Sequence, residues 1–253
     1  MKDKYYYLAI RKKFYFQHSF RSRAAFKLIQ INKKFFLLKN HTSIIDLCSF
    51  PGSWLQVGSQ LINKNKILLG VDLIYIKPLK EIYFLKTNIK NKNLSRFINK
   101  KFLNLKFKCL LNDGSPNIGG IQSLTSYNQN VLVKYGIMVL LENIQSLGDF
   151  VTKIFLTENF FNFVYVFRNL FVTTIIYKPS ASRLSSSEYY IIGKGLKKIN
   201  YSKKALFKCL FLSFKIERLV YKKNYLLSLS SDKPRFSRLI QDYLRKSVIT
   251  LIE

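Results

Sequence analysis

Acidic residues are scarce in this chain. Its 253 residues include 13 Asp and Glu against 43 Lys and Arg, which gives a formal net charge of +30 at pH 7. Such an excess predicts a polyanionic partner, because binding releases counterions from that partner. RNA, DNA and an anionic membrane all fit. Abundant Lys, Asn, Ile, Phe and Tyr with few Gly are also typical of an AT-rich coding sequence, but the depletion of acids favours a nucleic acid.

Cysteine and histidine are rare as well. Cys48, Cys109 and Cys209 have no CxxC spacing, so neither a disulfide framework nor a zinc site is indicated. We expect all three in the core of a protein from a reducing compartment. His18 and His41 stand alone in the sequence, which favours surface or packing roles over metal ligation. We therefore expect the protein to need no metal.

Long hydrophobic runs are also missing. The first fifteen residues mix Lys and Asp with Tyr, which argues against a secretory signal peptide. The most apolar later stretch, residues 155–177, is interrupted by charged and amide side chains, so it falls short of the roughly 18 apolar residues of a membrane span. The length and the 48% hydrophobic content instead predict one main globular domain outside the membrane.

The interpretation of the other segments depends on the stretch IIDLCSFPGSW at residues 44–54. An apolar run that ends in an acid leads into a Pro-Gly turn and a helical pattern, which predicts a strand, a tight loop and a helix start. In an open α/β sheet, Gly at such a loop lets a ligand approach the backbone, and helix N–H groups point outward. The loop at 48–53 lacks the GxGxxG of dinucleotide binders, so the pattern alone fits a nucleotide-like pocket or a structural turn.

Further candidate site residues directly follow other predicted strands or lie inside them. A βαβ unit is predicted over residues 43–72, and its last residue, Asp72, lies where such folds bind ribose hydroxyls. Asp113 lies in the turn sequence NDGSPN after a fourth strand at 107–111, beside the end of the first strand. Lys153 lies inside a fifth strand, where charge is disfavoured, which indicates a functional role.

Hydrophobic periodicity predicts the remaining elements. In the first helix, Phe26, Leu28 and Ile29 form the apolar stripe, and Lys27 at its edge, taken alone, fits a surface lysine. The Lys- and Asn-rich helix at 92–101 is expected to face solvent or RNA. Strands are predicted at 43–47, 66–72, 82–88, 107–111, 150–155, 171–177 and 188–192, and helices at 22–36, 52–62, 92–101, 125–146 and 159–170.

Both ends of the chain are basic. Residues 4–20 interleave aromatic and basic side chains, which suits stacking on RNA bases, packing through the tyrosines, or both. The tail at 194–253 fits either short helices that cap the domain or an RNA-gripping extension, with its clearest turn at 230–234.

Six motifs occur in an order typical of one family. They are SRAAFKLIQIN (22–32), IIDLCSFPGSW (44–54), GVDLIYIKP (70–78), NDGSPN (112–117), FVTKIF (150–155) and SEYYIIGKG (187–195). Through them the chain resembles the FtsJ/RrmJ ribose 2'-O-methyltransferases over about residues 4–197. The opening DKYYYLA, with SPN and IGG, is most similar to the eukaryotic nucleolar pre-ribosomal RNA (Spb1-type) branch, whose members often carry a long additional carboxyl-terminal region.

The resemblance implies the fold and the catalytic residues. The fold is α/β and Rossmann-like, with a seven-stranded, mostly parallel sheet and helices on both faces. It occupies a methyltransferase domain at 1–200, followed by a basic extension at 201–253 of unknown role. The implied cofactor is S-adenosylmethionine, and the implied catalytic tetrad is Lys27, Asp113, Lys153 and Glu188. Without the motifs, these four residues would be interpreted as simple salt bridges.

The chemistry suggests a role for each tetrad member. Methylation of a ribose hydroxyl needs a base in line with the methyl donor. We interpret Lys153 as that base, Lys27 and Glu188 as groups that orient it and the ribose, and Asp113 as the residue that holds the lysines. Neighbouring cations lower the pKa of a lysine and carboxylates raise it, so the sequence leaves the balance open.

The implied cofactor residues surround the same strand ends. The resemblance places Asp46 at the entrance of the loop, the residues at 52–54 beside the methionine part and Asp72 on the ribose. Asn88 replaces the Asp that usually reads the adenine amino group, so weaker binding is expected although an amide oxygen still accepts that hydrogen bond. Phe50 replaces a small residue and is expected near the pocket mouth. The full predicted set is Asp46, Pro51, Gly52, Ser53, Trp54, Asp72, Asn88 and Asp113.

These features lead to three functional hypotheses. The first is methylation of a ribose 2'-hydroxyl in large-subunit ribosomal RNA during ribosome biogenesis, in the nucleus and nucleolus. The second uses the same chemistry on the anticodon loop of a transfer RNA, and NDGSPNIGG favours the first. The third is a non-catalytic factor that grips pre-ribosomal RNA, motivated by Asn88, Phe50 and the charge. The intact tetrad favours an enzyme. The sequence indicates no particular protein partner.

Overall fold

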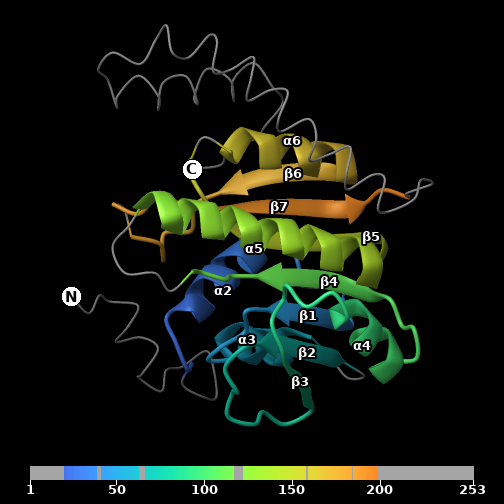
Figure 1. Ribbon diagram of the computed structural model, residues 1–253. Helices are drawn as coiled ribbons and strands as arrows, with labels where there is room; N and C mark the ends of the chain where they lie inside the picture. The colour runs from blue at the N-terminus through green and yellow to red at the C-terminus, as the bar shows by residue number, and fades with distance from the viewer. Residues whose placement is uncertain are drawn as a thin grey trace, which may run out of the picture.

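Seven strands form one sheet within the residues that the structure, a computed structural model, describes: 20–38, 41–62, 66–116, 122–157, 159–183 and 185–198. The strand order is β3-β2-β1-β4-β5-β7-β6 (Figure 1). The first five strands are parallel, and β7 is antiparallel to both of its neighbours. The strands are β1 (Ser43–Leu47), β2 (Ile67–Asp72), β3 (Ile82–Lys86), β4 (Phe107–Asn112), β5 (Ile144–Phe155), β6 (Phe171–Tyr177) and β7 (Glu188–Leu196).

Helices cover both faces of the sheet, and each face has its own hydrophobic core. One face packs against α2 (Ala24–Phe35) and α3 (Ser53–Leu61). The other packs against α4 (Leu94–Lys101), α5 (Gln122–Asn143) and α6 (Phe160–Leu170). This architecture confirms the predicted Rossmann-like α/β class.

The central strand β1 creates the crevice of the fold. All five of its residues are buried, as expected for a parallel strand covered on both faces. The chain enters its two neighbours from helices on opposite faces of the sheet, because α3 precedes β2 and α4 precedes β4. Ligands of open α/β sheets bind at such a switch point, outside the carboxyl ends of the strands. The loops after β1, β2 and β4 meet at this edge.

Two predictions of local structure were wrong. In α2 the fully buried apolar positions are Ala25, Leu28, Ile31 and Phe35, whereas Phe26 and Ile29 are only half-buried. The helix is therefore rotated relative to the predicted stripe. This rotation buries Lys27 to 7% exposure, so it is not a surface lysine.

The boundary between α5 and β5 also differs from the prediction, which extended the helix to residue 146. The strand already begins at Ile144, and its register with β4 shifts between Phe107 and Cys109. Leu147 has a positive φ of 64° in this irregular part, and the residues around it do not alternate between apolar and polar. Without that alternation the sequence pattern indicates no strand there.

Some expectations lie outside the described residues. These are the aromatic and basic segment at 4–19, the IGG at 118–120, His18, Cys209 and the extension at 201–253. Cys109 is buried in the core on the α2 and α3 face, and Cys48 is half-buried against the core on the opposite face. No helix in the described part of the chain has the length and apolar character that crossing a membrane would require.

Candidate active site

Three carboxylates gather at the crevice edge of the sheet. Asp46 comes from β1, Asp72 ends β2 and Asp113 follows β4. Burial, and then the charges of Asp113 and Asp72, raise the pKa of Asp46 well above its ordinary value. Asp46 is only 2% exposed, so its side chain is buried, one residue before the end of β1 and the loop that follows it. The chain is strongly basic, yet this edge is acidic.

Two buried polar atoms beside the crevice have no hydrogen-bond partner in the described structure. They are Oδ2 of Asp46 and Oγ of Ser49. Asp46 pairs with Gly70 across the β1–β2 ladder, and a Cβ built on Gly70 would lie 2.9 Å from the Ser49 hydroxyl. The two orphaned atoms therefore flank one glycine. Buried polar groups are rarely left unpaired, so this pair is suited to a polar ligand group.

Asp72 connects the two loops of the crevice. Its Oδ2 accepts a hydrogen bond from the N–H of Phe50 at 2.8 Å, and its Oδ1 accepts one from the N–H of Ile74 at 2.9 Å. Each carboxylate oxygen retains a further lone pair that can accept a ligand hydroxyl. Phe50 is 50% exposed, which places its ring on the surface beside this loop.

Asn88 lies in the turn after β3, with its side chain in a local contact. Its Oδ1 accepts a hydrogen bond from the N–H of Lys90 at 2.9 Å. The side chain is exposed. The amide oxygen therefore has one remaining lone pair for the predicted adenine contact.

Arg21 fastens the loop that precedes α3. Its Nη1 donates to the carbonyl oxygens of Pro51 at 3.0 Å and Lys77 at 2.7 Å, and its Nη2 donates to that of Pro78 at 3.1 Å. The guanidinium thus joins the loop after β1 to the loop after β2. Nothing in the sequence marks Arg21 as such a clamp, because a lone arginine before a helix carries no identifying pattern.

The helix α3 begins directly at this loop. Gly52 at its N-cap has φ of 101°, a conformation that favours glycine, and no side chain caps the first turn. Ser53 bonds the Ser22 hydroxyl at 2.7 Å, and the indole N–H of Trp54 donates to the carbonyl of Ala24 at 2.9 Å. Both side chains therefore face α2. What the start of α3 can offer a ligand is its uncapped N–H groups.

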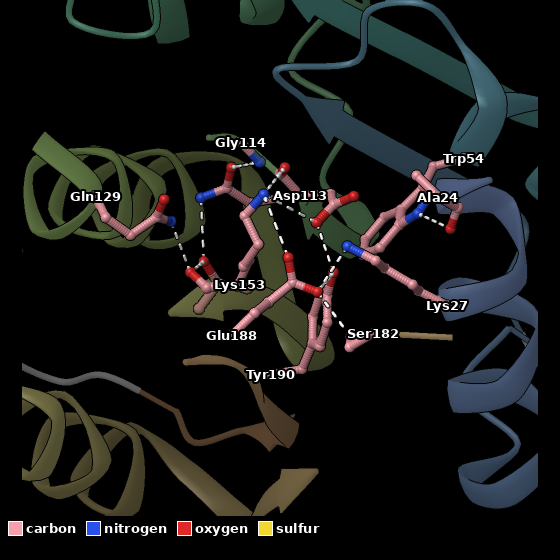
Figure 2. Close-up of polar contacts among 12 residues, drawn as sticks. Ala24, Lys27, Trp54, Asp113, Gly114, Gln129, Lys153, Ser182, Glu188 and Tyr190 are labelled. Carbon is pink, nitrogen blue, oxygen red and sulfur yellow. Dashed lines mark hydrogen bonds and ion pairs between the residues drawn. The ribbon is translucent and has the colours of Figure 1, made fainter. Parts of the chain in front are cut away.

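The four tetrad residues come from four separate segments and lie together (Figure 2). Lys27 Nζ is 2.6 Å from Glu188 Oε1. Lys153 Nζ is 3.4 Å from Asp113 Oδ1 and 4.0 Å from Glu188 Oε2, and it donates to the Asp113 carbonyl oxygen at 2.8 Å. Side-chain exposures range from 6% to 15%, so two cations and two anions share a nearly buried site.

Strand pleating explains how the side chains converge. Lys153 shares its face of β5 with Val151, whose side chain belongs to the α2 and α3 core, and Glu188 shares its face of β7 with Tyr190. These faces point toward α2, which supplies Lys27. Lys153, the lysine predicted inside a strand, therefore lies near the carboxyl end of β5, one residue beyond the position that pairs with Asn112 of β4.

Tyr190 and Ser182 complete the site, although the sequence analysis did not identify either. The Tyr190 hydroxyl donates to Asp113 Oδ1 at 2.6 Å and lies 3.3 Å from Glu188 Oε1, and Ser182 Oγ donates to Glu188 Oε1 at 2.7 Å. Burial and the two carboxylates raise the pKa of Tyr190 well above its ordinary value, so it remains a proton donor. The Glu-x-Tyr spacing on a strand was the signal that could have identified Tyr190.

Buried amides support the backbone around the lysine. Gln129 from α5 donates to the Lys153 carbonyl at 2.9 Å, and Asn112 donates to Oγ1 of Thr152 at 3.1 Å. Asn112 also accepts a hydrogen bond from the N–H of Gly114. These contacts position the ends of β4 and β5 relative to each other (Figure 2).

Thiol and metal chemistry have little support in the described residues. Burial and nearby carboxylates raise the pKa of Cys48 to about 12, which keeps it a thiol. No cluster of His, Cys, Asp and Glu there has the arrangement of a metal site.

A comparison with protein families shows which family the chain belongs to. The model of the FtsJ-like methyltransferases matches residues 20–196, which include the crevice and all four tetrad positions. The chain belongs to the FtsJ-like methyltransferase family.

Curated relatives of this FtsJ-like chain are much longer proteins. It is 37% identical over 196 residues to "AdoMet-dependent rRNA methyltransferase SPB1" of Candida albicans, covering 77% of this chain and 22% of that protein. It is 33% identical over 194 residues to "pre-rRNA 2'-O-ribose RNA methyltransferase FTSJ3" of Pongo abelii, again covering 77% and 22%. The chain therefore spans about a fifth of the length of these relatives.

A solved structure shares the FtsJ-like fold. A ribosomal RNA methyltransferase from Plasmodium falciparum superposes with a TM-score of 0.61 at 24% identity, covering 71% of this chain and all of that one. This likeness supports the fold assignment alone.

Proposed function

We propose that this chain transfers a methyl group from S-adenosylmethionine to a ribose 2'-hydroxyl of large-subunit ribosomal RNA or its precursor. The observation that carries the proposal is the paired tetrad, in which Lys153 lies between Asp113 and Glu188 at the edge of an acid-lined crevice. The names of the relatives favour ribosomal RNA as the substrate, and the net charge of +30 fits a polyanion. Ribosome assembly would place the protein in the nucleus and nucleolus.

The residues present fit the proposed cofactor. S-adenosylmethionine has an ammonium and a sulfonium group, and the crevice has the buried, unpartnered Oδ2 of Asp46 beside Asp72 and Asp113. The uncapped start of α3 after Gly52 suits the cofactor's carboxylate. Asp72 has lone pairs for the ribose hydroxyls, and the exposed Asn88 has one for the adenine amino group.

The tetrad is suited to in-line transfer between two bound groups. The cofactor supplies a methyl group on a positively charged sulfur. When bound, the cofactor would give this methyl group to the 2'-oxygen and keep the sulfur, and the amine of Lys153 would take the proton of the hydroxyl. Only the neutral form of an amine can accept that proton. Lys27 holds Glu188 at 2.6 Å, so both are fixed beside the ribose position.

Calorimetric titration with S-adenosylmethionine, followed by transfer assays, tests this proposal. We expect binding, labelling of ribosomal RNA but not transfer RNA, and loss of labelling with retained cofactor binding in Lys153→Ala. Lys108→Ala is the matched control, since Lys108 lies in β4 but close to its amino end. Absence of cofactor binding would favour the non-catalytic RNA-binding alternative, and full activity of Lys153→Ala would remove the role of that lysine.

A further inference from the structure

Helix α4 presents a row of positive charge to solvent. Arg96 and Lys100 are exposed and lie four residues apart, so they share one side of the helix. Lys92, also exposed, continues this spacing just before the helix begins. The buried side of α4 carries Leu94, Ser95 and Ile98.

No acidic residue balances this row locally. Residues 82–112 contain eight Lys and Arg and no Asp or Glu. Arg96, Lys100 and Lys101 form no ion pair with a carboxylate in the part of the chain that the structure describes. An ordinary solvated helix face usually carries charges of both signs. This face carries only positive charge, so it is suited to binding an external anion.

Exposed aromatic rings lie among these cations. Nζ of Lys101 lies 5.4 Å from the ring centroid of Tyr83, which is 47% exposed on the edge strand β3. Phe97 is 44% exposed and precedes Lys101 by one helical turn. Proteins that bind single-stranded nucleic acids combine such rings, on which bases stack, with cations that track the phosphates.

The row leads away from the crevice. Its first member, Lys92, follows the turn of Asn88 and Lys90 at the carboxyl end of β3, and α4 then runs toward the amino end of β4. Figure 1 shows α4 on the same face of the sheet as α5. Within α4, Arg96 and Lys100 are separated by about 6 Å along the helix axis at 1.5 Å per residue.

We propose that the α4 surface, defined as Tyr83, Lys92, Arg96, Phe97, Lys100 and Lys101, binds the RNA chain beside the segment whose ribose is methylated. This inference rests on the proposed function for its substrate and adds a second contact outside the tetrad. Lys92, Arg96 and Lys100 neutralise successive phosphates, and Tyr83 and Phe97 stack on bases.

The test measures RNA binding without any cofactor, so its result does not depend on catalysis. The variant combines Arg96→Gln, Lys100→Gln and Lys101→Gln. The charge-matched control combines Lys33→Gln, Lys197→Gln and Lys198→Gln, all exposed and at the end of α2 or after β7, remote from the β3 edge. Fluorescence anisotropy of a labelled single-stranded RNA is recorded at several salt concentrations, and thermal melting checks that both variants fold.

The α4 variant should bind RNA about ten-fold or more weakly than the control. Its plot of log affinity against log salt should be shallower by about 1.4, because the variant removes the two phosphate contacts of Arg96 and Lys100 and each contact on a single strand contributes about 0.7 to the slope. Equal losses in both variants would overturn the proposal, since the effect would then be general charge. A loss of binding to phosphatidylserine vesicles with RNA binding unchanged would also overturn it and assign the surface to a membrane.

Discussion

The Tyr190 hydroxyl should hold the catalytic carboxylates in place, and Tyr190→Phe tests this. The substitution removes one oxygen and keeps the ring, which is fully buried and packs 6.0 Å from Trp54. It leaves Asp113 Oδ1 without its 2.6 Å donor and Glu188 Oε1 without its 3.3 Å neighbour. Lys153 would then be the remaining donor to Asp113 Oδ1 among the described residues, at 3.4 Å.

The expected size of the effect of Tyr190→Phe follows from the loss of one hydrogen bond. A hydroxyl has a single proton, so only the shorter contact, to Asp113, counts fully. A hydrogen bond to a charged group contributes about 1.5–3 kcal/mol. Expressed in the transition state, this loss lowers kcat about 10-fold to 100-fold, since 1.36 kcal/mol is a factor of ten. Expressed in folding, it lowers Tm by about 3–12 °C for a domain of this size.

Steady-state methyl transfer and calorimetry separate these effects. We expect kcat to fall much more than the affinity for S-adenosylmethionine, because the Tyr190 hydroxyl bonds two tetrad carboxylates and only one of them, Asp113, also lies at the crevice edge. Tyr189→Phe is the control, since its hydroxyl has no hydrogen bond within the described residues and its ring packs on the opposite face of β7. If Tyr190→Phe turns over and melts as the wild-type protein does, the proposed positioning role is refuted.

Four further predictions address the surroundings of the site. Asp46→Asn should weaken cofactor binding, as measured by calorimetry, but raise the stability of the fold at pH 7–8. A carboxyl group whose pKa is raised by folding costs stability as the pH rises from the unfolded pKa of about 4 through the folded pKa, and Asn removes that cost. The gain should vanish near pH 3. Arg21→Lys should raise the Kd for the cofactor several-fold, because an ammonium cannot bridge Pro51, Lys77 and Pro78 as the guanidinium does; an unchanged Kd contradicts this. Asn88→Asp should tighten cofactor binding, and weaker binding would exclude the adenine contact. His41→Ala should cost about 2 kcal/mol in denaturant unfolding with kcat retained, since its buried bond to a carboxylate lies at the opposite edge of the sheet.

The fold was predictable where hydrophobic patterns are regular. The bounds of β1 and β6 agree with the predicted 43–47 and 171–177, because runs of apolar residues between turn signals define both strands. The start of β5 was missed because its irregular first half has no alternation. The burial of Lys27 was missed because it depends on Glu188 from a segment far along the chain, which no local pattern reports.

The site was predictable only in part, for a related reason. Sequence motifs located the tetrad residues, whose roles in catalysis stay predictions. The donors that orient them, Tyr190 and Ser182, contact the tetrad through tertiary packing. Likewise, the deep burial of Asp46 and its raised pKa follow from the central position of its strand, which no local pattern reports.

The most direct test of the account is the identity of the product. Ribosomal RNA is incubated with the protein and isotopically labelled S-adenosylmethionine, digested to nucleosides and analysed by mass spectrometry. The account predicts a labelled methyl group on the ribose, as a 2'-O-methylnucleoside, which is absent with Lys153→Ala and present with Lys108→Ala. A labelled methyl group on a base, or no label from a protein that binds both cofactor and RNA, would contradict it.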